Sequence, residues 1–305
     1  MSMDYDSYLW AAIPAMTLML IIYLFGLFGN VMWVLVTFRT KSLSSTCNYL
    51  LAFESIASSV HVTAHWYLAY LIYSGINAAP LQLCAYVMTI PIIGLCVGNV
   101  FILMIAVDRL AMVVAPMQYH KINQNFYLTI SCLLGFAFAA YTLVISHINA
   151  AKTPDTKVVC IIVGAMTGTP YGIYSTISLC MNIATFVCYA IIIIVLKLSQ
   201  QKTDKLFKPL MIMIMIVLFS WVLSSICLTL VSQTNNDVWI FYTPMYAGLG
   251  VNVSCACNFY VLYFMSSEYR QHFKNLFAKM CGGTTHSTTV SVMSVSNHKH
   301  RAVTR

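Results

Sequence analysis

The residues best suited to chemistry in this sequence are a cysteine, Cys84, and a charged pair that ends 25 positions later at Arg109. Cys84 precedes a long apolar run, which Asp108 and Arg109 close. A cysteine outside the cell can form a disulfide, and a carboxylate beside a guanidinium can form an ion pair. As a helix the stretch is about 37 Å long, at about 1.5 Å per residue, which exceeds a hydrocarbon core of about 30 Å. The spacing therefore predicts a membrane-spanning helix with Cys84 outside one face and Arg109 inside the other.

The composition requires helices of this kind to make up most of the chain. The 305 residues are 60% hydrophobic and only 8% charged, whereas a typical soluble chain is about 25% charged. Backbone groups in lipid need partners within their own segment, which favours helices. No phosphate-binding glycine loop, zinc-spaced Cys/His cluster or nucleophile elbow occurs, so we expect no enzyme, cofactor or metal site. The net charge of +8 comes from basic residues beside apolar runs, so we expect no nucleic acid partner.

Seven apolar runs predict an all-α membrane protein, a seven-helix bundle over residues 10–264. Each run exceeds the roughly 20 residues needed to span a bilayer. Of sixteen Lys and Arg residues, all but Lys152 and Lys157 fall on the side of Arg109. Positively charged loops stay in the cytoplasm, so we expect residues 1–9 outside the cell. The runs lie at about 10–38, 47–74, 81–114, 126–148, 170–198, 207–231 and 238–264.

The cysteines agree with this topology. Of the eleven, only Cys84 and Cys160 fall outside the membrane on the oxidising side. A disulfide between them is the simplest assignment, because disulfides persist in oxidising compartments. It would hold the loop at 149–168 over the outer mouth of the bundle.

The segment after the last run predicts a short amphipathic helix at residues 265–280. Capping groups come first, and apolar residues then form one stripe among basic ones, which is typical of a helix on the inner leaflet. Cys281 follows at a position suited to palmitoylation, although an idle cytosolic thiol is the alternative. Residues 281–305 are rich in Ser and Thr and are expected to form a disordered cytoplasmic tail, either plain or a phosphorylation platform.

Several short segments resemble a known family. Gly29-Asn30, Ser45-Thr46-Cys47-Asn48, Ala106 to Leu110 with Pro116 to His120, and Asn258 to Val261 running on to Arg270 are similar to rhodopsin-like G-protein-coupled receptors, and more narrowly to the nematode serpentine chemoreceptors of the Srsx class. The resemblance implies a heterotrimeric G protein as partner, with an arrestin and a receptor kinase at the tail. It also implies an inner switch built from Asp108, Arg109, Tyr189, Asp204 and Asn258. The inactive state would be favoured by an Arg109–Asp204 contact or by the Arg109–Asp108 pair alone.

The sequence departs from the family pattern in its polar centre and at its kink prolines. Ser58 stands where the sodium-binding aspartate is expected, and Glu54 lies one helical turn earlier. An ionisable residue in a span usually faces the bundle interior, so we expect a polar core around Glu54. Glu54 either replaces the missing aspartate or is a protonated, hydrogen-bonded carboxyl without an ion. The core residues would be Asn30, Glu54, Ser58 and Asn99, and the missing prolines put a kink-driven opening in doubt.

The candidate ligand pocket is neutral and aromatic. The aspartate of the amine receptors in this superfamily is replaced by Pro91, and the lysine of the opsins by Asn252. Such a pocket suits an external neutral small molecule, although several of its residues could instead form the interfacial aromatic belt. The candidates are Trp66, Thr89, His147, Tyr171, Tyr174, Trp221, Trp239, Tyr242 and Tyr246.

These features together predict a multi-pass chemosensory receptor of the plasma membrane, with sensory cilia as one location. The runner-up is a neuropeptide receptor of the same fold, because a few acidic residues outside could meet a basic peptide. From another class, a transporter or channel is disfavoured by the odd number of spans and the lack of an inverted repeat.

Overall fold

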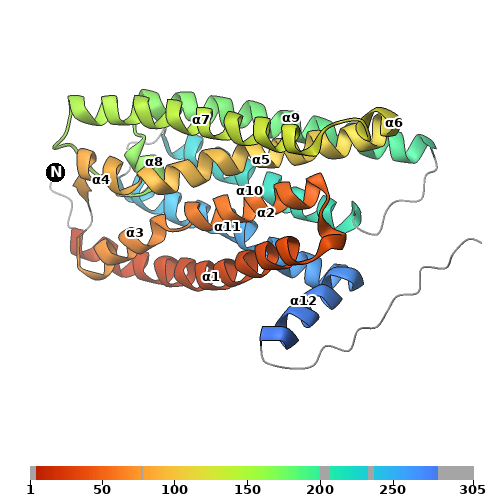
Figure 1. Ribbon diagram of the computed structural model, residues 1–305. Coiled ribbons are helices and arrows are strands. Elements are labelled where there is room, and N and C mark those ends of the chain that lie inside the picture. The colour runs from red at the N-terminus through yellow and green to blue at the C-terminus, as the bar shows by residue number, and fades with distance from the viewer. Residues whose placement is uncertain (1–4, 77, 200–206, 233–236, 281–305) are drawn as a thin grey trace, which may run out of the picture.

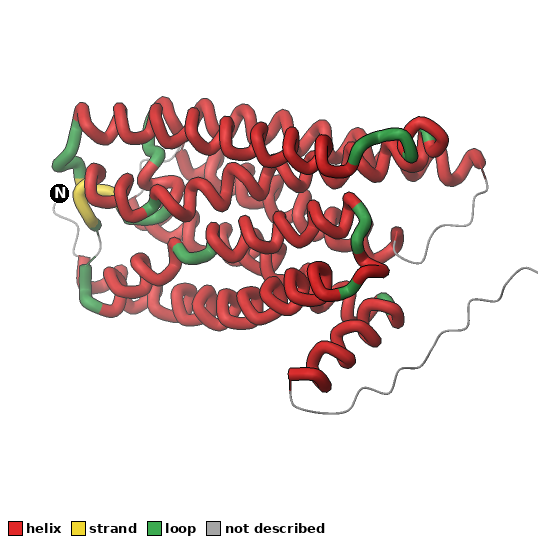
Figure 2. The backbone as a smooth tube through the Cα atoms, viewed as in Figure 1, coloured by secondary structure: helices red, strands yellow, loops and turns green. Residues whose placement is uncertain are grey.

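The computed structural model describes residues 5–76, 78–199, 207–232 and 237–280. The chain forms a bundle of long helices joined by short connections (Figures 1 and 2). Among the described residues, six helices are long and apolar enough to cross a membrane. They are α1 (Tyr5–Arg39), α5 (Thr89–Val114), α7 (Gln124–Lys152), α9 (Thr169–Ser199), α10 (Phe207–Ser232) and α11 (Asp237–Met265).

The second predicted span is helical but broken, which is why it is missing from those six. It consists of α2 (Thr46–His61) and α3 (Ala64–Tyr73). Through the break the backbone bonds tighten, with Thr63 N–H bonded to the carbonyl of Val60 and His65 N–H to that of Val62. This is the three-residue spacing of a 3₁₀ turn.

A close approach of α5 accompanies the break in the second span. A Cβ placed on Gly94 would lie 2.5 Å from the backbone N of His61 and 2.6 Å from the carbonyl oxygen of Ala57. The backbone of α5 therefore lies directly against the end of α2, and only a glycine fits there.

The two ends of the bundle carry different short elements. At the end where α1 begins, β1 (Ala79–Pro80) pairs antiparallel with β2 (Lys157–Val158), close to α4 (Leu81–Val87) and α8 (Ile162–Ala165) (Figure 1). The opposite end carries η1 (Lys41–Leu43), α6 (Pro116–Tyr119) and α12 (Ser267–Met280).

The core is centred on α5, which packs against α2, α7 and α9. On one side α10 packs along α11, yet α10 hardly touches α9. The space that α9 and α10 leave between them is where the site described below is found.

The helix α12 is anchored to the bundle by two aromatic side chains. The rings of Tyr269 and Phe273 are fully buried and lie 5.0 and 6.0 Å from the ring of Trp33 in α1. The Tyr269 hydroxyl donates to Oδ1 of Asn48 at 2.8 Å, and burial raises the pKa of Tyr269, so the hydroxyl stays protonated. Arg270 donates to the carbonyls of Tyr263 and Phe264, which caps the end of α11.

The predicted stripe of this helix is therefore turned largely toward α1 and α11, and its contact with the inner leaflet stays a prediction. Cys281 and the predicted tail at 281–305 lie outside the described residues.

Candidate functional site

A disulfide holds the loop that closes the end of the bundle where α1 begins. The predicted bond between Cys84 and Cys160 is present, with the two Cα atoms 5.4 Å apart and both side chains fully buried. Beyond Cys160 the loop places Ile161, Ile162 and Met166 over a cavity in the bundle. The bond therefore fixes the roof of that cavity.

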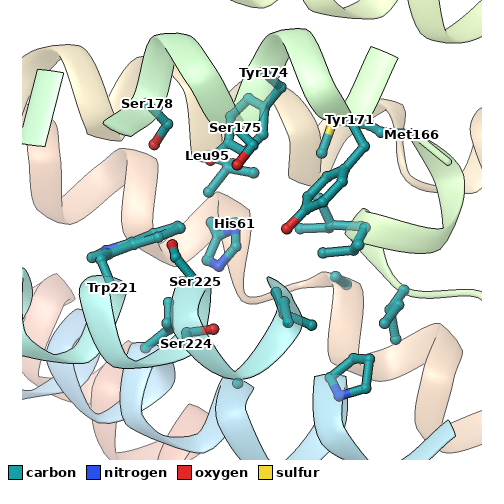
Figure 3. A pocket seen from close by; sticks show the side chains of 18 of the residues that line it. His61, Leu95, Met166, Tyr171, Tyr174, Ser175, Ser178, Trp221, Ser224 and Ser225 are labelled. Atoms are coloured by element: carbon teal, nitrogen blue, oxygen red, sulfur yellow. The ribbon is translucent and has the colours of Figure 1, made fainter. Parts of the chain in front are cut away.

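The cavity lies between α2, α3, α5, α9, α10 and α11 and has a volume of about 130 Å³. Among the described residues that line it, none is Asp, Glu, Lys or Arg. Figure 3 shows His61 near its centre, with Tyr174 and Ser175 of α9 on one side and Trp221 and Ser225 of α10 on the other. A neutral space of mixed polarity is suited to a small organic molecule.

Three of the nine predicted pocket residues line this cavity, namely Tyr171, Tyr174 and Trp221. The other six do not. Trp66 is 56% exposed on the outside of α3, where its ring packs edge-on against Tyr23. Thr89 and His147 bond to each other at 3.0 Å between α5 and α7. Trp239, Tyr242 and Tyr246 line a separate cavity along α10 and α11.

Near the carboxyl end of α5, a buried carboxylate is held by three hydrogen bonds. Asp108 is 1% exposed and accepts from Nη2 and Nε of Arg109, at 2.6 and 3.0 Å, on Oδ2. Its Oδ1 accepts from the Tyr119 hydroxyl at 2.8 Å. Burial, together with the negative charge of Asp108, raises the pKa of Tyr119 to about 12, so this hydroxyl is a donor at neutral pH.

Two other residues of the predicted switch, Tyr189 and Asn258, are not joined to this pair. Tyr189 is buried, and its hydroxyl has no partner within the described ranges. Asp204 lies outside those ranges. Asn258 bonds to Glu54 instead.

The predicted polar core forms as separate groups. Glu54 is 5% exposed and accepts from the Ser58 hydroxyl at 2.6 Å and from Nδ2 of Asn258 at 2.7 Å. Asn30 donates instead to the carbonyl of Cys255, at 3.2 Å. Asn99 donates to Tyr174 and Ser178 at 3.0 and 3.1 Å, so it supports a wall of the cavity.

A small pocket beside Glu54 joins the polar core to the larger cavity. His61, Leu95 and Trp221 line both spaces. These three side chains therefore form the floor of the cavity and the roof of the polar core.

Comparison with known families decides where this architecture belongs. Residues 23–277 match the family described as serpentine type 7TM GPCR chemoreceptor Srsx. The chain belongs to the Srsx family of serpentine chemoreceptors. Among curated proteins, no match was found. The matched residues run from α1 into α12 and include the disulfide, Arg109 and all of the residues that line the cavity except Met19.

In this Srsx chain the structure brings to the site several residues that were not among the nine predicted pocket residues or the predicted switch, although pocket lining was one interpretation of the two histidines, beside interfacial placement and a proton relay. His61, His65 and Asn252 line the cavity, and Tyr119 holds Asp108. His61 and His65 could have been predicted to line the same space, because polar side chains four positions apart in an apolar helix share one face. Tyr119 gave no such signal, because its role depends on how the loop after α5 folds back.

Proposed function

We propose that this Srsx chain is a plasma-membrane chemosensory receptor, present also in sensory cilia, that binds an external neutral small molecule and activates a heterotrimeric G protein. The observation that carries the proposal is the uncharged cavity beneath the disulfide-held loop. Family membership supports a receptor role, and the absence of charge along the described lining favours a neutral ligand over an ionic one.

The amino terminus would lie outside the cell. The Cys84–Cys160 bond needs an oxidising compartment, and it lies at the end of the bundle where α1 begins. The inner end would then present Arg109, α6 and α12 to the cytoplasm. An arrestin and a receptor kinase would act on the tail at 281–305.

The ligand would act on the inner end through the floor of the cavity. His61 and Trp221 touch both the cavity and the pocket of Glu54, and Glu54 is bonded to α11 through Asn258. At the inner end the Arg109–Asp108 pair would favour the inactive state.

A cell assay tests this proposal. Cells that express the receptor with a promiscuous G protein are screened with volatiles, neutral metabolites and peptides. We expect a small neutral compound to raise the second-messenger signal. The signal should disappear in Arg109→Ala at equal surface expression.

Two further variants test whether the ligand binds in the cavity. Ser225→Phe fills the cavity and should abolish the response, whereas Leu230→Phe on the lipid-exposed face of the same helix should preserve it. A receptor that answers only to peptides would be a neuropeptide receptor, and ion flux without G protein would indicate a channel. Full coupling by Arg109→Ala would contradict the role of this arginine.

A further inference from the structure

The floor of the cavity contains a histidine without a hydrogen-bond partner. Nδ1 of His61 is buried and unpaired, and no described residue bonds to its Nε2. The ring faces the cavity (Figure 3). Polar groups removed from water are nearly always hydrogen-bonded, because leaving one unpaired is costly. Within the described part of the chain, the hydrogen-bonding capacity of His61 is therefore unmet.

A second imidazole lines the same cavity, and its hydrogen bonds fix its tautomer. Nδ2 of Asn252 donates to the carbonyl of Gly248 at 2.8 Å, so Oδ1 of Asn252 is left to accept. This oxygen lies 2.5 Å from Nε2 of His65, which must carry the hydrogen. In a neutral ring Nδ1 of His65 is then an acceptor.

The facing wall of the cavity supplies hydroxyl groups. Ser224 and Ser225 of α10 line the cavity with Trp221, and Figure 3 shows both serines on the α10 side of His61. Neither hydroxyl is bonded to another described side chain. Each can donate one hydrogen bond and accept others. The cavity thus offers imidazole acceptors on one side and hydroxyl donors on the other.

We infer that the ligand is a small hydroxyl compound, an alcohol or a phenol, whose O–H donates to His61 and whose oxygen accepts from Ser224 or Ser225. A hydroxyl matches both walls because it donates and accepts through one atom. This inference rests on the proposal that the cavity is the ligand site.

Other ligand classes match the lining less well. A carboxylate would enter without a proton to give, and no Lys or Arg belongs to the described lining. An ammonium group would find no carboxylate there. Bringing either ion into such a space is costly without a counter-charge. An ether or hydrocarbon would leave His61 unpaired.

The test measures thermal unfolding of the purified full-length receptor in nanodiscs. The probes are phenol and 1-hexanol, with anisole and hexyl methyl ether as matched compounds that lack the donor, and benzoate and benzylamine as charged analogues. We expect the two hydroxyl probes to raise Tm in proportion to their millimolar concentration. The ethers and the charged analogues should raise it less.

Variants then assign the effect to His61. His61→Leu should weaken the apparent affinity for phenol about tenfold, because one hydrogen bond is lost. His61→Gln keeps an acceptor and should retain most of the affinity. His147→Leu removes a histidine outside the cavity and should leave the affinity unchanged. Should His61→Leu misfold, His61→Gln with the alcohol and ether series still tests the inference.

Four results would overturn the inference. They are equal stabilisation by ethers and alcohols, preferential stabilisation by benzoate or benzylamine, unchanged phenol affinity in His61→Leu, and no stabilisation by either hydroxyl probe.

Because the measurement needs no G protein, the inference and the proposed function fail separately. Hydroxyl binding without G-protein activation contradicts the proposed function alone. Signalling by compounds without a hydroxyl group, unchanged in His61→Leu, contradicts the inference alone.

Discussion

Replacing Tyr119 with phenylalanine removes one of the three hydrogen bonds that hold Asp108. The hydroxyl donates to a carboxylate that is 1% exposed, whereas the Arg109 side chain paired with it is 14% exposed. A hydrogen bond to a charged group contributes about 1.5–3 kcal/mol. Tyr119 is only half-buried, so water can partly replace its hydroxyl and the lower value applies. Without the Tyr119 hydroxyl, Asp108 is held only by Arg109 and is positioned less firmly. Because the Arg109–Asp108 pair is proposed to favour the inactive state, basal signalling should rise.

The expected size follows from that energy. A difference of about 1.4 kcal/mol is a tenfold change in an equilibrium ratio. If activation of the wild type breaks the Tyr119–Asp108 hydrogen bond completely, Tyr119→Phe should raise the ratio of active to inactive receptor about tenfold. If half of the bond's energy is kept in the active state, the increase should be about threefold. The measurement is ligand-free second-messenger production, normalised to surface receptor.

Tyr127→Phe is the matched control for this prediction. Its hydroxyl also bonds to α5, but to the carbonyl of Met104 at 2.9 Å and not to Asp108. Basal signalling in Tyr127→Phe should equal that of the wild type. If Tyr119→Phe and Asp108→Asn both show wild-type basal signalling at equal surface expression, the Asp108 pair does not restrain the receptor.

Four other experiments test further features of the structure. Cys160→Ser should impair surface expression and leave Cys84 open to a thiol label, and ready labelling of the intact receptor without reductant would contradict the bond. Gly94→Ala should reduce Tm strongly, because its Cβ would lie 2.5 Å from the backbone N of His61, whereas Gly98→Ala meets only the Ala57 Cβ at 3.7 Å and should be tolerated. Glycosidase should not change electrophoretic mobility, because Asn252, in the sequence's Asn-X-Ser/Thr motif, is 4% exposed and hydrogen-bonded inside α11. Basal signalling of Tyr119→Phe relative to wild type should be the same at about pH 6 and about pH 8, because the tyrosine loses its proton only near a pKa of about 12.

The extents of several spans and the disulfide could be predicted, because both follow from strong physical effects. The single helix predicted from Cys84 to Arg109 was wrong, because α4 ends at Val87 and α5 begins at Thr89. Apolar runs end where the hydrocarbon ends, and the predicted 170–198 and 238–264 fall within a residue of α9 and α11. The disulfide followed from topology, because only two cysteines lay on the oxidising side. Neither prediction needed knowledge of how the helices are rotated.

The pocket residues could not be predicted as well, because the rotation of a helix about its own axis is hard to read where it is apolar on all sides. Along α10 and α11 the lipid-facing and inward-facing residues have similar side chains, so Trp239 and Tyr246 were assigned to the pocket although they face another cavity. The break after His61 has no proline or glycine within α2 or α3. It coincides with Gly94 on another helix, and such a long-range contact has no local signal.

The break in the second span has a mechanical consequence for signalling. The helices α9, α10 and α11 each run without interruption, and α9 and α10 lack prolines at the positions where the family is expected to bend. The joint between α2 and α3 is flanked by His61 on one side and His65 on the other, and both rings border the cavity. A ligand bonded to His61 and to α10 would restrain that joint and stiffen the second span, which packs against Gly94 of α5. In this receptor the second span, α2 and α3, would then respond first to the ligand, and α10 would move as a consequence.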